Sequence, residues 1–587
     1  GSLESSGGTL NFSGKINQTG GVINIADSIF SLNSDLSKTG GTLQTSGTTI
    51  TPLSNLNITS DTTITAKTIE LSDKTLSLGS ENSNLILTDS FSIQNSSATL
   101  NTGNADLSVE GVITLSDGKL TSTGGKIDFI NGGSQSGGFE IDLGESFLSL
   151  GADFIKTSGE IKSTLATLDL LSNITFTSDS GLIFQKLNLN DLKLILGSAS
   201  TDVEISSNLT LDNSTEGVNT GDADFKLSGS FTSSNGILSS TSGIISLLAG
   251  GQISGSGVLD LTGSTWAMGG NFVKSNGTLT SSGTLTLSET NLKLESNSSL
   301  TSDEPLNFVD LNLNDFVLTL GSATSDLTIE NAVVIDTSTE GISTGAADLI
   351  LQESMTLSNG KISSTAGDIS FISGGIISEG GELDITGSTW ILGSDLESSE
   401  GEITFSNTNL SLADSNITLT TDQAMSFVTL NLNYRTLTLG SETSDISVTE
   451  ALTISGTTEG ILSNEADLDL DGFVIIDGEG RIKSSGGKIS FSNGGRLSGS
   501  AELDLTGSDW ALGGDFEKRS STGSESSGTL TLSETNLELE DSITLTSDIE
   551  VLSFVGLSLK NFTLTLGSET SDLTIQNSVT IDSSTEG

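Results

Sequence analysis

The sequence predicts an all-β protein, a right-handed parallel β-solenoid of about 29 coils with essentially no α-helix. Three observations lead to this prediction. A unit of about 120 residues occurs five times along the chain. Within each unit, apolar and polar residues alternate with a period of two over short segments, as in strands with one buried face. Glycine-containing polar turns separate these segments at intervals of roughly 8–12 residues.

Two structural anchors mark the repeated unit. The glycine of a Leu-Gly-Ser tripeptide recurs once per unit, at Gly79, Gly197, Gly321, Gly440 and Gly567. An aromatic residue recurs with nearly the same period, at Phe30, Phe147, Trp266, Trp390 and Trp510. Phe30 and Phe147 take the same place as the Trp residues and lack the indole N–H. We therefore predict that the aromatic residues fill a wider part of the solenoid core or cover a coil corner, rather than bind a ligand.

The stretch Leu311–Ile329 indicates how one coil is built. Apolar residues alternate with polar ones, the alternation breaks at Asn314–Asp315, and a polar, glycine-containing turn lies between Leu320 and Leu327. This order predicts a strand, a bend, a second strand and a turn. Asn side chains near such bends, for example Asn190, are expected to form hydrogen bonds between coils.

The repeated unit is therefore interpreted as a super-repeat of about six coils of about 20 residues each. Tandem immunoglobulin-like sandwiches would also give repeats of roughly 100 residues, but they would need longer strands and linkers between the units. No change in composition separates the units here. We predict one continuous solenoid over residues 1–587, with five super-repeats at approximately 1–100, 101–218, 219–342, 343–461 and 462–587.

The super-repeats differ in length at one place, between the aromatic anchor and the next Thr-Ser-Asp-like turn. Insertions are expected to form corner loops, because a one-residue slip within a strand would turn its apolar row outward. We predict such loops around Gly277–Ser281 and within Ser520–Ser527, and a turn or bulge near Ile549–Ser553 that absorbs one extra residue.

The composition limits the classes of function. The 587 residues include no Cys and no His, and the formal net charge is −53. Such a charge repels nucleic acids and anionic membranes, so neither is expected as a partner. No apolar run approaches the ~18 residues of a membrane span, so no membrane insertion is expected. The acidic surface would at most bind divalent cations weakly, and we predict no cofactor.

Two series of acidic residues recur with the super-repeat. One precedes the Trp anchors, and the other belongs to the Thr-Ser-Asp-like turns. We interpret both as turn-forming or solvated residues rather than metal ligands, because equivalent acids about six coils apart would lie roughly 30 Å from one another. The two series are Asp260, Asp384 and Asp504, and Asp61, Asp179, Asp303, Asp422 and Asp548.

The sequence favours a protein that is not an enzyme. It offers no His for a catalytic triad, no Cys nucleophile and no phosphate-binding loop, and no catalytic residue is assigned. A carbohydrate-active β-helix, such as a polysaccharide lyase or a phage tailspike, stays an alternative because many acids are present. An ice-binding solenoid is a further alternative, although Thr-x-Thr occurs only at scattered places such as Thr284–Thr286.

The segment Gly277–Leu294, GTLTSSGTLTLSETNLKL, returns in shortened form at Gly528–Leu539. Together with the missing Cys and His and the uncapped repetition, this style resembles the β-helical surface adhesins of bacteria, the filamentous-haemagglutinin-like exoproteins and autotransporter passengers. The resemblance covers the whole chain and is compositional in kind.

The resemblance implies a non-enzymatic, extracellular stalk or adhesive fibre at a bacterial cell surface. Its expected partners are neighbouring copies, the rest of its own long chain, and host or surface glycans. About 29 coils at ~4.8 Å each would give a rod of roughly 140 Å. Because the Ser-Thr-Glu-Gly motif at the end of the chain also occurs internally, we expect a segment of a longer protein, with its export signal and anchor elsewhere.

Overall fold

The computed structural model describes residues 1–275, 282–519, 527–548, 551–581 and 587. These residues form a parallel β-solenoid of about 27 turns with 55% strand and no helix, which confirms the predicted fold class and comes close to the predicted 29 coils. The described part of the chain accordingly holds no helix that could cross a membrane.

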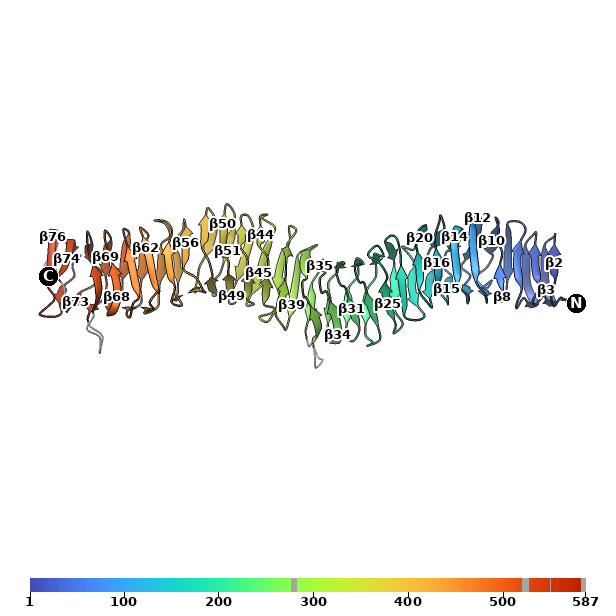
Figure 1. Cartoon of the computed structure of the whole chain (residues 1–587), viewed down its shortest axis with the longest axis horizontal. Helices are drawn as coiled ribbons and strands as arrows, with labels where there is room; N and C mark the ends of the chain where they lie inside the picture. Colours follow the sequence, from blue (N-terminus) through green and yellow to red (C-terminus); the bar gives the residue numbers. More distant parts are fainter. Residues whose placement is uncertain (276–281, 520–526, 549–550, 582–586) are drawn as a thin grey trace. The chain divides into compact units, whose positions relative to one another are not determined.

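The chain forms two compact units, Gly1–Ser296 and Asn297–Gly587. Figure 1 shows that short strands stack turn upon turn in each of them. The boundary between the units falls inside the third predicted super-repeat. A single array that runs without interruption through all five super-repeats stays a prediction.

One turn of the solenoid consists of three short strands joined by corners. In the second unit such a turn contains β42 (Val317–Leu320), β43 (Leu327–Ile329) and β44 (Val333–Ile335). Each strand pairs in parallel with the strand three places further along the chain. These partners are β45 (Gly341–Gly345), β46 (Leu349–Leu351) and β47 (Met355–Leu357).

The core is a thin stack of apolar side chains inside the turns. The pairing register places like residues over one another, for example Leu318 over Ile342 and Leu327 over Leu349. All four side chains are buried, whereas Thr319, between Leu318 and the next apolar residue, is exposed. The period-two pattern of the sequence therefore corresponds to inward and outward positions on each strand.

The predicted bend at Asn314–Asp315 is confirmed. Both residues have positive φ angles, 52° and 68°, and the Phe316 N–H donates to the Leu313 carbonyl at 2.9 Å. Two consecutive left-handed residues in a four-residue turn are typical of a type I′ turn, which Asn and Asp tolerate better than most residues. The same hydrogen bond closes turns 71–74, 189–192, 432–435 and 559–562.

The super-repeat does not contain a whole number of turns. β42 and its equivalent in the next super-repeat, β59 (Thr436–Leu439), are seventeen strands apart in the chain. With three strands per turn, this spacing is five turns and two further strands. β42 therefore stacks with β39 (Ser298–Ser302) and β45, whereas β59 belongs to another sheet, with β56 (Ile417–Thr421) and β62 (Gly460–Asn464). Equivalent residues of these two super-repeats lie on different faces.

The Leu-Gly-Ser glycines are required by the close approach of the preceding turn. A Cβ atom on Gly321 would overlap the hydroxyl of Thr301, and the backbone φ of this glycine is not positive. The glycines at 79, 197, 440 and 567 meet the hydroxyl of the equivalent Thr in the same way. A glycine is needed at this position because only it leaves room for a hydroxyl-bearing neighbour.

The serines beside this glycine tie the two turns together. The Ser322 hydroxyl donates to the Ser302 carbonyl at 2.8 Å, and the Ser302 N–H donates to the Ser325 hydroxyl at 2.8 Å. The hydroxyls of Ser322 and Ser325 are 2.7 Å apart. The Leu-Gly-Ser tripeptide and the Thr-Ser-Asp turn therefore lie one turn apart and are joined by hydrogen bonds.

Four of the five aromatic anchors share one buried position, and Phe147 does not. Phe30, Trp266, Trp390 and Trp510 are buried, whereas 40% of Phe147 is exposed. The buried position in the second super-repeat is taken by Leu148, which pairs with Ile127. Residues one apart in a strand point to opposite faces, so the prediction that Phe147 takes the same place as the other aromatic anchors was wrong by one residue.

The predicted corner insertions concern residues that the structure does not describe. Residues 276–281 and 520–526 cover most of the two predicted loops, and residues 549–550 belong to the third predicted irregularity. These three segments lie outside the described residues, so the loops and the bulge stay predictions.

Candidate functional site

The acidic residues that precede the Trp anchors form Asx turns, as predicted. The Thr262 hydroxyl and N–H both donate to one carboxylate oxygen of Asp260, at 2.7 and 3.2 Å. Asp384 and Asp504 make the same two contacts with the Thr two residues further on. Each of these carboxylates therefore shapes a turn of its own backbone.

The Thr-Ser-Asp acids have partners that the sequence analysis missed. Asp179 forms an ion pair with Lys156, whose side chain is 1% exposed, and Asp61 pairs with Lys38 in the same way. The Lys156 ammonium also donates to the Ser180 hydroxyl at 2.8 Å. The hydrogen bond from Lys156 is the main reason that the pKa of Asp179 lies below its usual value.

Equivalent lysines are buried in two further super-repeats, and one super-repeat lacks the lysine. Lys274 and Lys518 are both 1% exposed, and Ser398 occupies the same position in the fourth super-repeat. The signal in the sequence is an aromatic or Leu residue two places before the lysine. These lysines are enclosed by the turns, so we assign them a structural role.

A ladder of three aspartates runs over consecutive turns of the second unit. One oxygen of Asp326 accepts the Asp348 N–H at 3.0 Å, and one oxygen of Asp348 accepts the Asp368 N–H at 2.7 Å. Burial raises the pKa of Asp348, and the charges of Asp326 and Asp368 raise it further. The described residues include no group of three or more acidic side chains suited to a metal ion.

This ladder makes a pH-dependent contribution to stability. The folded state raises the pKa of Asp348, so the negative charge opposes folding at neutral pH and ceases to do so as the pH falls through the folded pKa. Asp348→Asn keeps an oxygen acceptor for Asp368. It is expected to raise the free energy of unfolding at pH 7 by a few tenths of a kcal/mol after solvent screening. Urea denaturation between pH 3 and 8 measures this.

The control is Asp224→Asn in the first unit, which belongs to an equivalent but separate ladder. There Asp202 accepts the Asp224 N–H, and Asp224 accepts the Ile244 N–H. Because Ile244 carries no charge, this variant should gain less at pH 7. A gain for Asp348→Asn that stays constant down to pH 3 would contradict the electrostatic explanation.

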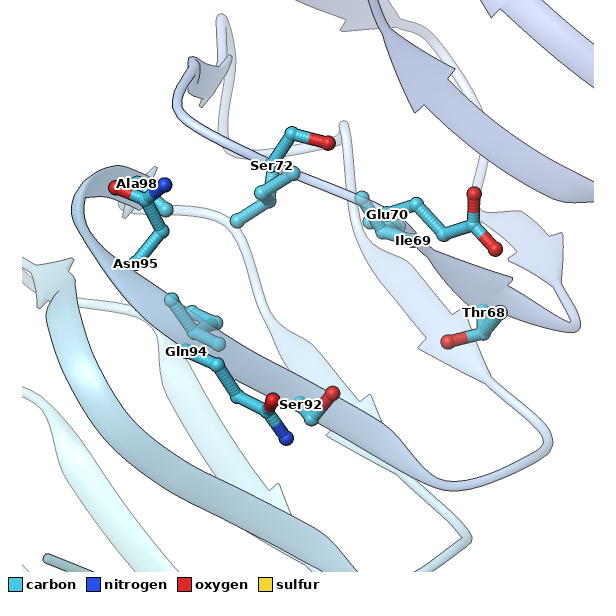
Figure 2. Close-up of a pocket in the computed structure, with 10 residues that line it drawn as sticks. Thr68, Ile69, Glu70, Ser72, Ser92, Gln94, Asn95 and Ala98 are labelled. Carbon is cyan, nitrogen blue, oxygen red and sulfur yellow. The ribbon is translucent and has the colours of Figure 1, made fainter.

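The first super-repeat contains a pocket of about 590 Å³ between two consecutive turns (Figure 2). One side is formed by β9 (Thr68–Ile69) and the residues that follow it, and the other side by β12 (Phe91–Gly103). The pocket is lined by Thr68, Ile69, Glu70, Leu71, Ser72, Ser92, Ile93, Gln94, Asn95 and Ala98. Ile69, Leu71, Ile93 and Ala98 are apolar and buried, and the other lining side chains are polar.

The pocket lies where a sheet ends. β9 is the last strand of a four-stranded sheet with β2 (Thr9–Phe12), β4 (Ile29–Leu32) and β6 (Thr49–Pro52). The next turn does not continue this sheet, because β12 pairs with other strands and its register shifts on either side of Gln94. The irregular segment of β12 bends away from β9 and leaves space between the turns.

The second, third and fourth super-repeats place a carboxylate in the equivalent corner, that of Glu216, Glu340 and Glu459. Glu216, in the Ser-Thr-Glu-Gly motif, accepts the backbone N–H groups of Asp212 and Asn213 at 2.8 and 3.2 Å. Glu459 accepts two backbone N–H groups in the same manner. In the first super-repeat this position is Ala98, so no carboxylate occupies the corner.

Four polar side chains in the pocket have no partner within the described part of the protein. They are the carboxylate of Glu70, the hydroxyls of Ser72 and Ser92 and the amide of Gln94, and all four residues are exposed. In contrast, the Thr68 hydroxyl donates to the Ser90 carbonyl at 3.1 Å, and the Asn95 side-chain oxygen accepts the Ser97 N–H at 3.0 Å. The pocket thus offers an acceptor, an amide and two hydroxyls to a ligand.

Two other grooves belong to the repeat itself. A groove of about 450 Å³ lies over β23 (Leu182–Phe184) and the strands stacked on it, and one of about 410 Å³ lies over β57 (Met425–Phe427) and its neighbours. The two starting strands are equivalent in the super-repeat. These grooves therefore recur at equivalent places of two super-repeats, whereas the pocket at Glu70 departs from the pattern.

The chain was compared with protein-family models, with curated proteins and with solved structures, and none of the three comparisons gives a match.

Proposed function

We propose that this chain is a non-enzymatic segment of an extracellular fibre or stalk at a bacterial cell surface, with a structural and adhesive role. The observation that carries the proposal is that the recurring residues join consecutive turns of the solenoid. Gly321, Ser322 and Ser325 bond to the turn before them, and Lys156 and Asp179 join two turns in the same manner. The repeated features thus hold one turn to the next, which is the requirement of an extended fibre.

The charge supports the same role. A net charge of −53 keeps a repetitive surface soluble and disfavours nucleic acids and anionic membranes as partners. We propose neighbouring copies, the rest of its own chain and surface glycans as partners, and no cofactor. The pocket at Glu70 has one carboxylate among its lining residues, whereas glycoside hydrolysis generally uses a pair. This favours binding of a carbohydrate over its cleavage.

The test displays the chain on a non-adherent bacterium and measures attachment of the cells to glycan-coated surfaces. We expect more attached cells than with an unrelated solenoid of equal length. The purified chain is also incubated with neutral and acidic polysaccharides, and reducing ends and unsaturated products are measured. Turnover of any polysaccharide, or attachment no greater than that of the unrelated solenoid, would overturn the proposal.

A further inference from the structure

We propose that the pocket between β9 and β12 binds an uncharged sugar unit of a glycan. This inference rests on the proposed adhesive function only in taking the ligand to be a surface glycan. The pocket itself is defined by its lining residues and by its departure from the repeat.

The size and the lining of the pocket fit one or two sugar rings. Its volume of about 590 Å³ lies within the range of roughly 300–1,000 Å³ that is usual for small-molecule sites. Glu70, Ser92 and Gln94 line the pocket and are exposed. A ligand that fills this space must therefore be rich in hydrogen-bonding groups.

The hydrogen-bonding groups suit neighbouring hydroxyls. The ionised carboxylate of Glu70 only accepts hydrogen bonds, so it needs a donor from the ligand. The amide of Gln94 donates with its nitrogen and accepts with its oxygen, and each sugar hydroxyl does both. Figure 2 shows Glu70 and Gln94 on two consecutive turns, and both residues line the pocket, so a sugar that fills it would lie beside both.

The charges around the pocket disfavour an acidic sugar. Glu70 would repel a carboxylate or a sulfate, and the nearby cations are already paired. The Lys74 ammonium lies 2.7 Å from a carboxylate oxygen of Asp73, and the Lys67 ammonium lies 3.8 Å from one of Asp89. No cation lines the pocket itself. An uncharged sugar is the class of ligand that these groups accept.

Three pocket positions of the first super-repeat differ from their equivalents in the second. Where the second super-repeat has Asn188, Asn190 and Glu216, the first has Glu70, Ser72 and Ala98. Asn190 donates to the Leu170 carbonyl of the preceding turn at 2.8 Å, as predicted for corner Asn residues. The first super-repeat thus lacks the carboxylate that Glu216 provides in the second. It has instead the carboxylate of Glu70, on the opposite side of the pocket, which has no partner among the described residues.

The test uses the full chain and calorimetric titration with maltotriose, cellotriose, triacetylchitotriose and 3′-sialyllactose. We expect at least one neutral trisaccharide to bind and 3′-sialyllactose to bind at least tenfold more weakly. Glu70→Gln should weaken the binding about tenfold. Ala98→Glu should abolish it, because it places in the corner the carboxylate that Glu216 provides in the second super-repeat.

Ser96→Ala, outside the pocket lining, is the matched control and should bind as the unchanged chain does. Circular dichroism and thermal unfolding confirm that each variant is folded. Binding that Glu70→Gln and Ala98→Glu leave unchanged, or no binding of any neutral sugar, overturns the proposed site. Attachment of cells that display the chain distinguishes failure of the pocket proposal from failure of the adhesive function. Equal attachment by the unchanged chain and Ala98→Glu overturns only the pocket, and no attachment by either overturns the adhesive function.

Discussion

Asp179→Ala is expected to lower the free energy of unfolding around the second super-repeat by about 2–3 kcal/mol. The substitution leaves the Lys156 ammonium buried, with the Ser180 hydroxyl as its remaining hydrogen-bond partner among the described residues. Loss of one partner of a buried pair costs about 3–5 kcal/mol, and we reduce this value because the Asp179 side chain is 40% exposed. Hydrogen exchange, read by mass spectrometry on peptides from the adjoining turns, measures the change locally.

The chain contains its own control for this prediction. In the fourth super-repeat Ser398 replaces the lysine, and Asp422 accepts the Glu400 N–H at 2.7 Å. Asp422→Ala should therefore cost only the value of one hydrogen bond, about 1 kcal/mol. Lys156→Met combined with Asp179→Ala should recover most of the lost stability, because it removes both charges. Equal losses for Asp179→Ala and Asp422→Ala would contradict the role of the lysine.

The same ion pair predicts a dependence on acid. Lys156 lowers the folded-state pKa of Asp179, so the carboxylate stabilises the fold above its unfolded pKa of about 4. This contribution is lost as the pH falls through the lower, folded-state pKa. The difference in stability between the unchanged chain and Asp179→Ala should thus shrink below about pH 4.

The alternation of residues predicted short strands with one buried face, because inward and outward positions have a period of two in every strand. The 120-residue repeat and the closely spaced turns, with no linkers between the units, favoured a solenoid over tandem sandwiches. The bend at Asn314–Asp315 was found in the same way, as a break in that period. The stacking of Thr301 on Gly321 was not predictable, because the offset between one turn and the next depends on corner lengths and strand pairing.

Two features of the candidate sites were hidden for different reasons. Lys156 was missed because a lone lysine in an acidic, repetitive chain reads as a solvated charge, and its burial depends on the turns around it. The pocket was not predicted because Ala98, which stands where the Ser-Thr-Glu-Gly motif has Glu, gives no sign in the sequence of an open space. Only the paired walls at Glu70 and Gln94 reveal that the missing carboxylate leaves usable space.

Leu148→Ala is expected to lower the free energy of unfolding of the first unit by about 2–5 kcal/mol, and Phe147→Ala by less than about 1 kcal/mol. Leu148 is completely buried and pairs with Ile127 and Leu168 in the core. Phe147 is the larger residue, but its side chain lies on the outer face of the same strand, β18 (Phe147–Leu150). Denaturant titration, followed by the fluorescence of Trp266 in a chain whose other two tryptophans are replaced by Phe, measures both variants.

The adjacent pair tests the register of the strand directly. If the sequence period of the aromatic anchors decided which residue enters the core, Phe147→Ala would be the more damaging change, because it removes the larger side chain. In the observed register the order is reversed, since the loss follows the buried volume that is removed and not the size of the residue. A loss for Phe147→Ala equal to or above that for Leu148→Ala would show that β18 pairs with its neighbours one residue out of the register seen here.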